Sequence, residues 1–323
     1  MVKLEDYKIK FLDYLDTEIQ LIEPKNLYEP IQYILQIGGK RLRPILTLVS
    51  THYFNGNYKD ALPAALAIEI FHNFTLVHDD IMDEASLRRG KSTVHKKWDI
   101  NRGILSGDAM LLMANQAFEQ YDSPKFKDLM SLFNKTAIEV CEGQQYDIDF
   151  ETRNEVSIPQ YKKMITYKTA VLVACSLKMG AIIANASSND ADFIYRYGLN
   201  LGIAFQLQDD YLDTFGNEKT FGKRIGGDII ENKKTFLYLK LLEVISPEDK
   251  LIVLDWFSST EDTERKIIEV TALYKKYDIP LLVEQEIDKY TKASFESLQS
   301  TSINEEGILF FTKLGNDLLQ RTV

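Results

Sequence analysis

The chain has 323 residues, of which 45% are hydrophobic, and it carries a formal net charge of −10 at pH 7. A chain of this length can bury a large core, and length alone is compatible with one to three domains. Its acidity argues against nucleic acid as a partner, because a nucleic-acid site needs a surplus of basic residues. The sequence contains no Gly-, Ser- or Pro-rich linker, so we expect a single domain over residues 1–323.

Cysteine content and the N-terminal sequence bear on where the protein works. Cys141 and Cys175 are isolated and lack the spacing of a metal site, so we expect two reduced core thiols in a cytoplasmic protein. The N-terminus lacks the basic-then-apolar pattern of a signal peptide, and no run of about 18 apolar residues appears. We therefore expect neither secretion nor a membrane span.

Proline positions predict where several helices begin, because proline is tolerated in the first helical turn. These positions are Pro30, Pro124, Pro159, Pro247 and Pro280. Ser123, Ser157 and Ser246 precede three of them and are expected to cap free N–H groups. Apolar residues follow a helical period between these points, and one such face carries Tyr161, Ile165, Lys168 and Leu172. The sequence predicts an all-α fold of roughly ten or more helices with essentially no sheet.

The first stretch with chemical character is Gly38-Gly39-Lys40-Arg41-Leu42-Arg43-Pro44. Its glycines are expected to end a helix that begins near Pro30, and three cations follow them. Taken alone, this is an ordinary helix end with basic residues, which the helix dipole favours.

An acidic motif follows a long apolar run. Ala64 to His78 contains neither Gly nor Pro, which predicts a buried helix, and it leads into Asp79-Asp80-Ile81-Met82-Asp83. On a helix Asp79 and Asp83 share a face, with carboxylates roughly 6 Å apart that repel each other unless a cation lies between them. Mg²⁺ suits such carboxylates, and Arg88-Arg89 just downstream could grip phosphate. A single motif of this kind is equally consistent with a solvated acidic helix end.

A second copy of the motif decides between these readings. Asp209-Asp210-Tyr211-Leu212-Asp213 repeats the spacing and ends another mostly apolar run, Leu199 to Leu207. Two such motifs inside apolar sequence predict two acidic helix ends that face one cavity. From about Gly38 to Lys233 the chain therefore resembles the trans-isoprenyl diphosphate synthases of the polyprenyl synthetase family. The resemblance implies an all-α, isoprenoid synthase-type bundle around a central cavity, with one motif on each of two facing helices.

The resemblance implies the ligands of a magnesium site. The direct ligands would be Asp79, Asp83 and Asp209, with three Mg²⁺ ions in each active site once substrate is bound. Three further carboxylates would act through water or through those ligands, namely Asp80, Asp210 and Asp213.

The resemblance also assigns basic and polar residues to two substrates. Isopentenyl diphosphate would be held by Lys40, Arg43, His72 and Arg89. The allylic diphosphate would be held by Arg88, Lys168, Thr169 and Lys223, with Gln206 near the allylic carbon and Lys233 completing the cationic set. Each lysine alone is an ordinary surface residue, and a lone histidine on an apolar helix is more often a core residue. Lys223 begins a loop that closes over the site in relatives.

The implied reaction is ionisation followed by condensation. Charge on the leaving diphosphate would be stabilised by metal ions and by Arg88, Lys168 and Lys223. The metal ions would be held by Asp79, Asp83 and Asp209, and these six residues form the expected catalytic set. The double bond of isopentenyl diphosphate then attacks the allylic cation, and the leaving diphosphate takes up the proton. The step needs no side-chain nucleophile, in line with the absence of any Ser/His/Asp arrangement in the sequence. Relatives are typically homodimers, and this too is implied only by the resemblance.

Product length is expected to depend on Phe74. It lies five residues before Asp79, so its Cα is about 7–8 Å deeper along the same helix. In the family an aromatic residue here stops elongation, although aromatic residues on buried helices usually belong to the core. Thr75 is small, and the first motif has no insertion, as in geranylgeranyl-type members. We expect a C15 to C20 product, leaning to C20.

Three other functions fit the same residues less well. An HD-type metal phosphohydrolase would use His78-Asp79, but it needs further histidines, of which only His52, His72 and His95 remain. It also leaves the second aspartate motif unexplained. A terpene cyclase uses the first motif with Mg²⁺, but it would lack the basic stretch Gly38–Pro44 and a second motif of this type. A non-catalytic subunit of a synthase heteromer would carry a degraded motif, whereas both motifs are intact. The last third, Asp249 to Val323, carries no motif, so we expect it to contribute packing.

Overall fold

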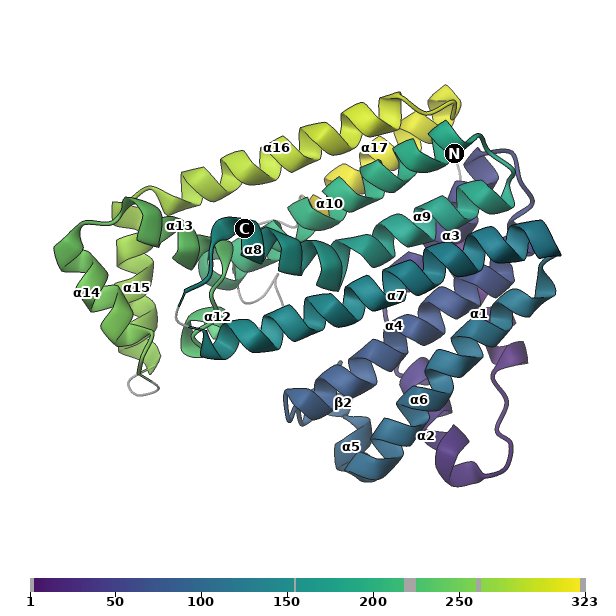
Figure 1. Ribbon diagram of the computed structural model, residues 1–323, viewed down its shortest axis with the longest axis horizontal. Coiled ribbons are helices and arrows are strands. Elements are labelled where there is room, and N and C mark those ends of the chain that lie inside the picture. The colour runs from purple at the N-terminus through teal and green to yellow at the C-terminus, as the bar shows by residue number, and fades with distance from the viewer. Residues whose placement is uncertain (1–2, 154, 218–224, 260–262, 320–323) are drawn as a thin grey trace. The chain divides into compact units, whose positions relative to one another are not determined.

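The computed structural model describes residues 3–153, 155–217, 225–259 and 263–319, and these are almost entirely helical (Figure 1). The longer helices are α1 (Leu4–Glu18), α2 (Lys25–Gln36), α3 (Leu42–Tyr53), α4 (Leu62–Met82), α6 (Ile100–Gln116), α7 (Ser123–Thr152), α8 (Ile158–Ile165), α9 (Val171–Ile183), α10 (Ser188–Phe215), α13 (Phe236–Val244), α14 (Pro247–Trp256), α15 (Thr263–Lys276), α16 (Ile279–Gln299) and α17 (Glu305–Leu319). The short elements are η1 (Tyr58–Ala61), α5 (Val94–Lys97), η2 (Ala117–Gln120), the π-helical turn η3 (Thr166–Ala170) and α12 (Gly227–Ile230). One two-residue hairpin, β1 (Leu87–Arg88) with β2 (Lys91–Ser92), is the only sheet among the described residues. The all-α prediction is confirmed.

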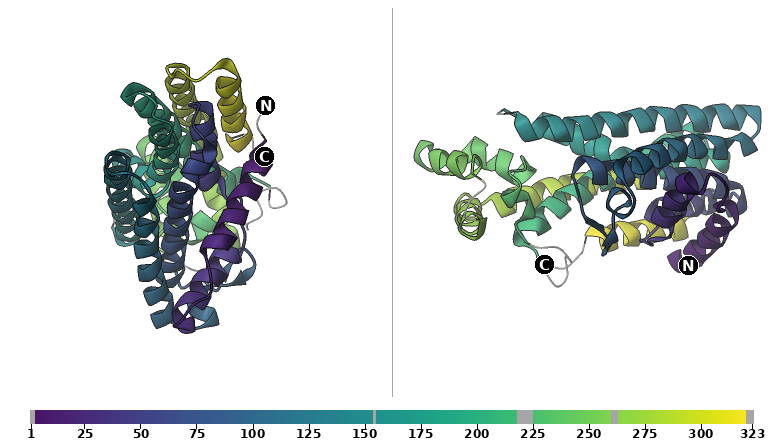
Figure 2. Two further views of the ribbon diagram at one scale, coloured as in Figure 1. Left: turned by 90° about the vertical axis from the view of Figure 1, so that its right-hand side faces the viewer. Right: turned by 90° about the horizontal axis from the view of Figure 1, so that it is seen from below.

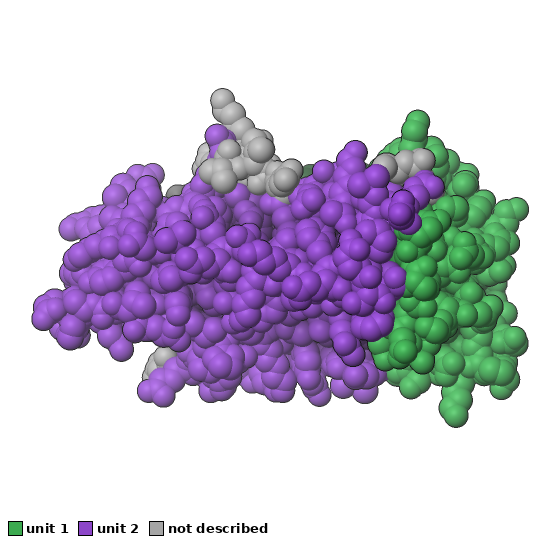
Figure 3. Space-filling model, turned by 90° about the horizontal axis from the view of Figure 1, so that it is seen from above, with its two compact units in different colours: residues 1–134, 175–192, 302–304 green, residues 135–174, 193–301, 305–323 purple. Residues whose placement is uncertain are grey.

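The chain divides into two compact units, which Figure 3 shows in different colours. Unit 1 comprises residues 1–134, 175–192 and 302–304, and unit 2 comprises residues 135–174, 193–301 and 305–323. The single domain expected from the sequence stays a prediction.

Helix α4 is the central element of unit 1. Its residues from Pro63 to Phe71 are all buried, including the charged Glu69, and it packs against α3 and α6. A helix that is apolar on all sides is stable only when other helices surround it. Pro63 lies in the first turn, where the missing N–H costs nothing. The buried helix predicted over Ala64 to His78 is confirmed, and it continues to Met82.

The C-terminal helices build much of the core of unit 2. Leu207 of α10 and Phe236 of α13 belong to one buried cluster with apolar residues of α15 and α16. Helix α14 lies beside α15, and α16 lies beside α17 (Figures 1 and 2). The packing role expected for Asp249 to Val323 therefore agrees with this cluster.

One predicted helix start and one predicted cap are wrong. Helix α2 begins at Lys25, so Pro30 lies inside it rather than at its start. The Asp122 side chain, not that of Ser123, accepts the N–H of Lys125 at the start of α7, at 3.3 Å. Aspartate one position earlier satisfies the same free donor. The other two serines cap as predicted, since Ser157 accepts the N–H of Gln160 and Ser246 that of Asp249.

The predicted helical face around Lys168 is interrupted by the π-helical turn η3. Gly143 of α7 lies against this turn, and a Cβ on it would be 2.2 Å from the backbone N of Lys168. Helix α7 can approach η3 this closely only because residue 143 has no side chain. A π turn adds a residue to the helix and often occurs at functional sites.

Burial separates the two cysteines and bears on the membrane prediction. Cys175 is buried as expected, but Cys141 is exposed, so its assignment to the core was wrong. The segments Tyr58–Met82 and Ile158–Ile183 are long and apolar enough to cross a membrane, yet 72% and 61% of their most apolar windows are buried inside the protein. Such burial is typical of core helices in soluble proteins.

Candidate active site

The first acidic motif lies at the C-terminal end of α4 in unit 1. The helix ends at Met82, and Asp83 follows it, with its N–H still bonded to the carbonyl oxygen of Asp79 at 2.8 Å. Asp79 and Asp83 are thus one helical turn apart, as predicted, although Asp83 lies just outside the helix. A helix C-terminus carries partial negative charge, so carboxylates there reduce stability unless a cation is present. This placement favours a cation-binding role for the pair.

Asp80 has a different environment from its neighbours in the motif. Its side chain is buried and accepts Arg88 Nε at 2.9 and 2.8 Å on its two oxygens, with Arg88 Nη2 at 2.7 Å. Two such bonds fix the plane of the guanidinium. Asp80 therefore orients Arg88.

A tight hairpin sends Arg88 and Arg89 in different directions. Arg88 pairs with Lys91 in the ladder, so Arg89 and Gly90 form the two-residue turn, with φ of 53° and 75°. Positive φ at both positions is what a type I′ turn requires, and it is unfavourable for arginine. Arg89 donates to the Gly38 carbonyl oxygen. Arg89 is thus held in a conformation that costs backbone energy.

The basic stretch after α2 wraps around Arg89. Gly38 and Gly39 have φ of 99° and 128°, and a Cβ on Gly39 would be 2.6 Å from Arg89 Nη1. Arg41 is buried and donates to Glu69 of α4 and to the Leu35 carbonyl oxygen. Arg41 is therefore part of the fold, whereas Lys40 is exposed.

Arg43 and His72 meet in a strongly positive environment. Arg43 Nη1 lies 3.3 Å from His72 Nε2. Burial, together with the charges of Arg43, Arg89, Arg88 and Arg41, keeps the pKa of His72 well below its usual value. Burial likewise lowers the pKa of Arg43. Three predicted residues, Arg43, His72 and Arg89, thus share one region with a surplus of positive charge, which suits an anion.

The residues expected to limit product length lie one turn or more before the acidic motif. Phe74 is buried, and its ring centroid is 4.8 Å from that of His78 and 5.6 Å from that of Phe71. Thr75 donates to the His72 carbonyl oxygen at 2.8 Å. Phe74 is therefore held between two rings in the apolar part of α4.

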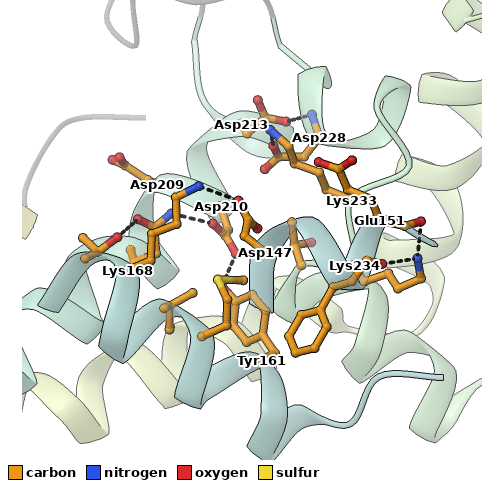
Figure 4. Close-up of a pocket in the computed structure, with 16 residues that line it drawn as sticks. Asp147, Glu151, Tyr161, Lys168, Asp209, Asp210, Asp213, Asp228, Lys233 and Lys234 are labelled. Carbon is orange, nitrogen blue, oxygen red and sulfur yellow. Dashed lines mark hydrogen bonds and ion pairs between the residues drawn. The ribbon is translucent and has the colours of Figure 1, made fainter. Parts of the chain in front are cut away.

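Unit 2 contains a cavity of about 200 Å³ into which the second acidic motif points (Figure 4). Its acidic lining residues are Asp147, Glu151, Asp209, Asp210, Asp213 and Asp228, and its basic ones are Lys168, Lys233 and Lys234. Thr169 and Gln206 also line it. The cavity thus brings together the site residues predicted for this unit among those that the structure describes, while Lys223 lies outside the described residues.

A hydrogen-bonded chain crosses the floor of this cavity. Thr169 donates to Gln206 Oε1 at 3.2 Å, Gln206 Nε2 donates to Asp210 Oδ1 at 3.1 Å, and the Tyr161 hydroxyl donates to Asp210 Oδ2. Burial and the nearby Asp228 raise the pKa of Asp210 to about 8. A bound cation would favour the charged form of this carboxyl and lower that pKa.

The last aspartate of the second motif organises the backbone beside the cavity. Asp213 Oδ2 accepts the N–H of Asp228 at 2.9 Å, and the Asp213 carbonyl oxygen accepts that of Gly226 at 2.6 Å. Lys233 Nζ lies 2.6 Å from Glu231 and 3.5 Å from Asp228. Asp213 therefore fixes the start of α12, which carries Asp228.

Lysines complete the lining. Lys168 lies in the π-helical turn, and its Nζ is 2.5 Å from Asp147 Oδ2. Lys234 donates to the carbonyl oxygens of Phe150 and Glu151 at 2.6 and 3.3 Å, which caps the end of α7. Lys168 is thus oriented by a carboxylate, much as Arg88 is.

The donor set fits Mg²⁺. No three His, Cys, Asp or Glu side chains in the described part of the chain lie close enough to hold a metal ion unaided. Mg²⁺ does not require this, because it usually takes one or two carboxylates and completes its shell with phosphate oxygens and water. The carboxylates of Asp79 and Asp83, and separately that of Asp209, offer such incomplete oxygen sites.

Several lining residues were missed in the sequence. Asp147 and Asp228 lie outside any repeated motif. Lys234 was not predicted because the family resemblance assigned a role only to the neighbouring Lys233. Tyr161 was read only as part of a helical face, yet its hydroxyl binds Asp210. A tyrosine at the start of the helix that carries Lys168 was the available signal, but its partner is distant in sequence.

Known proteins resemble this chain over almost its full length. The family described as Polyprenyl synthetase matches residues 24–274. A geranylgeranyl diphosphate synthase of Sulfolobus acidocaldarius is 38% identical over 294 residues, covering 90% of this chain and 88% of that one. Another, from Methanosarcina mazei, is 39% identical over 251 residues, covering 77% and 76%. A crystal structure of a geranylgeranyl pyrophosphate synthase matches all of both chains with a TM-score of 0.95 and 48% identity.

Proposed function

Since the chain belongs to the polyprenyl synthetase family, we propose that it is a trans-prenyltransferase that condenses isopentenyl diphosphate with an allylic diphosphate and releases diphosphate. The proposed product is a short all-trans prenyl diphosphate of C15 to C20, leaning to C20. Relatives named geranylgeranyl diphosphate synthases support this length, and so does the buried aromatic Phe74.

One observation carries the proposal, namely that the two units hold complementary kinds of site. Unit 1 has a positive region around Arg43, His72 and Arg89, suited to a diphosphate. Unit 2 has an acidic cavity with lysines at its edge, suited to a second diphosphate bound through metal ions. A condensation of two diphosphates requires one site of each kind, because only one substrate loses its diphosphate.

The chain's own residues would do the following. Isopentenyl diphosphate is held by Lys40, Arg43, Arg89 and His72. The low pKa of His72 keeps its ring neutral, so it contributes a hydrogen bond rather than a charge. Lys168 and Lys233 bind the allylic diphosphate, while Asp147 and Asp80 keep Lys168 and Arg88 oriented. Asp79, Asp83 and Asp209 would hold Mg²⁺, which supplies charge stabilisation for the departing diphosphate. Preoriented cations need no rearrangement as charge develops on the leaving group.

This assignment includes finer points of the same site. Three Mg²⁺ ions are proposed for each active site with substrate bound, and Asp80, Asp210 and Asp213 are proposed to act indirectly. Their contacts support the last point, since Asp80 binds Arg88, Asp210 binds Tyr161 and Asp213 caps α12. Lys223 is proposed as the last member of the catalytic set defined from the sequence.

Two other enzymes are weaker candidates. In a phosphohydrolase of the HD type, His78 would bind metal, but its Nε2 lies 3.3 Å from the Ile104 carbonyl oxygen and its ring packs on Phe74. A terpene cyclase needs no second diphosphate site, so the region around Arg43 and His72 would have no purpose.

We further propose a cytoplasmic homodimer that meets through α6. Ile104, Leu105 and Leu112 lie on this helix with 41%, 60% and 70% of their surfaces exposed. Exposed apolar residues grouped on one helix are typical of an interface. Sedimentation of wild type and a Leu105→Glu variant tests this, since the variant should sediment as a monomer. A wild type that sediments as a monomer would contradict it.

The decisive experiment is a product analysis. Purified protein is incubated with Mg²⁺, isopentenyl diphosphate and a C5, C10 or C15 allylic diphosphate, and the products are measured by mass. Diphosphate release is measured with and without isopentenyl diphosphate. A prenyltransferase releases diphosphate and lengthens the primer only when both substrates are present, whereas a cyclase or phosphohydrolase releases phosphate species without isopentenyl diphosphate.

A further inference from the structure

A lysine that the proposed chemistry does not use is fully buried in unit 2. Lys266 lies in α15 and has no exposed surface. Its ammonium donates to Asn232 Oδ1 at 2.5 Å and to the Ser259 carbonyl oxygen at 3.1 Å. Lysine is almost never fully buried without a specific partner, because removing an ammonium from water costs free energy. Burial lowers its pKa accordingly. The free-energy cost of burying Lys266 indicates that its contacts have a structural role.

The partner of Lys266 occupies a critical turn. Asn232 ends helix α12 in a left-handed conformation, with φ of 58°. Its N–H donates to the Ile229 carbonyl oxygen at 3.3 Å, and the N–H of Lys233 donates to that of Asp228 at 2.9 Å. This pair of bonds is the Schellman motif, in which one left-handed residue reverses the chain at a helix end. The reversal returns Lys233 toward Asp228, and both line the cavity.

Helix α15 also contacts the other end of α12. Gly226 precedes α12 with φ of 80°, and a Cβ on it would be 2.8 Å from Cγ1 of Ile267, the neighbour of Lys266. The N–H of Gly226 donates to the Asp213 carbonyl oxygen at 2.6 Å. Helix α12 has only four residues, so its position depends on these contacts at its two ends.

We propose that Lys266 is a positioning residue whose ammonium holds the turn at Asn232 and thereby keeps Asp228 and Lys233 in place for the metal-bound allylic diphosphate. This gives a helix of the C-terminal third, which sequence patterns linked only to packing, a part in the active site. The inference rests on the proposed function for the identity of the ligand. It does not make Lys266 a catalytic residue, because Lys266 does not line the cavity and acts through Asn232.

Two substitutions test the contact from both sides. Lys266→Met keeps the length and apolar stem of the side chain and removes the donor. Asn232→Gly removes the acceptor and still permits the left-handed turn. The matched control is Lys276→Met, the same change in the same helix, at an exposed lysine that pairs with Asp249. If Lys266→Met does not fold, Asn232→Gly still tests the proposal.

The readouts separate positioning from general destabilisation. At a temperature well below unfolding, both test variants should raise the KM for the allylic diphosphate and the Mg²⁺ concentration for half-maximal rate by about tenfold, an effect typical of removing an outer partner of a metal site. The KM for isopentenyl diphosphate should stay within about twofold, since its residues lie in unit 1. The double variant should be no worse than either single one, because both remove the same contact.

A second readout needs no turnover. Mg²⁺ with inorganic diphosphate should raise the Tm of wild type and of Lys276→Met, and this rise should shrink in Lys266→Met and Asn232→Gly. Unchanged KM values, Mg²⁺ dependence and diphosphate-induced Tm rise in both test variants would overturn the proposal, even if their baseline Tm falls. Failure of the proposed function would differ, because wild type itself would then lengthen no primer, and the diphosphate-induced Tm rise would still test Lys266.

Discussion

Arg88 donates from Nε to both carboxylate oxygens of Asp80, at 2.9 and 2.8 Å. The Asp80 side chain is 1% exposed, and Arg88 compensates its charge. Both residues lie in motifs assigned to substrate or metal binding, yet the structure pairs them with each other. Their coupling is a stability feature as well as a functional one.

Arg88→Met should destabilise the protein by about 3 kcal/mol, because it leaves a buried carboxylate without its partner. Asp80→Asn added to Arg88→Met should recover much of this loss, since the unpaired charge disappears. Urea unfolding of both single variants and the double variant measures the coupling. Strictly additive losses would contradict it.

Metal dependence should be absolute. EDTA should abolish condensation and Mg²⁺ restore it, and Asp79→Ala or Asp209→Ala should lower kcat by about a thousandfold, because each removes stabilisation of charge in the transition state. Asp288→Ala, at an exposed position of α16, is the control. Near-wild-type rates in both motif variants would remove these residues from the metal site.

The two diphosphate sites should separate in kinetics. Lys40→Ala and Arg43→Ala should raise the KM for isopentenyl diphosphate, and Lys168→Ala that for the allylic substrate. Each loses a charge-assisted contact of about 1.5–3 kcal/mol, or roughly 10- to 100-fold. Initial rates with each substrate varied in turn measure both constants. If Lys40→Ala raises only the allylic KM, the two sites are reversed.

His72 should make stability depend on pH. Its pKa in the folded protein is well below 6.5, so the unfolded chain binds a proton first as the pH falls. The stabilisation is present above about pH 6.5 and is lost below it, by up to about 1.4 kcal/mol per pH unit. Urea unfolding between pH 5 and 8 gives the free energy of unfolding at each pH. This free energy should change less steeply with pH for His72→Asn than for wild type. Equal slopes would show that His72 does not titrate as described.

The length of the prenyl product should depend on Phe74. Phe74→Ala should open the apolar part of α4 and shift the product from C15–C20 to C25 and beyond, while KM values for both diphosphates change little. Removing a buried aromatic should also cost about 3–5 kcal/mol of stability, so products are compared at a low temperature. Phe311→Ala, at a buried position of α17, is the control, because it removes a buried aromatic side chain outside α4. Unchanged lengths, or C30 and longer from wild type, would place the limit at another residue.

The sequence was sufficient where a feature depends on local spacing. Asp79 and Asp209 each follow a long apolar run, so the helix and the motif at its end could both be predicted. Asp122 replaced Ser123 as a cap because either side chain can reach the same donor, and sequence does not rank them. The close approach of Gly143 to the π turn at Lys168 is a tertiary contact without a local signal.

Contacts between ordinary residues distant in sequence could not be predicted. Lys266 and Asn232 are common residue types, and only the packing of α15 on α12 brings them together. Tyr161 and Asp147 likewise acquire their partners, Asp210 and Lys168, from helix packing. The role of each of these residues depends on its burial and its partners, and both are known only from the folded structure.

The left-handed conformation of Arg89 has a consequence for selection experiments. Glycine or asparagine at this position of the hairpin turn would relieve backbone strain of about 1 kcal/mol or more. A library screened for heat resistance alone should therefore enrich such replacements at position 89, and the enriched clones would lose the guanidinium that we propose binds isopentenyl diphosphate. Heat-resistant descendants of this protein would therefore need a second filter for turnover, because the replacement that relieves strain at this turn removes a proposed substrate ligand.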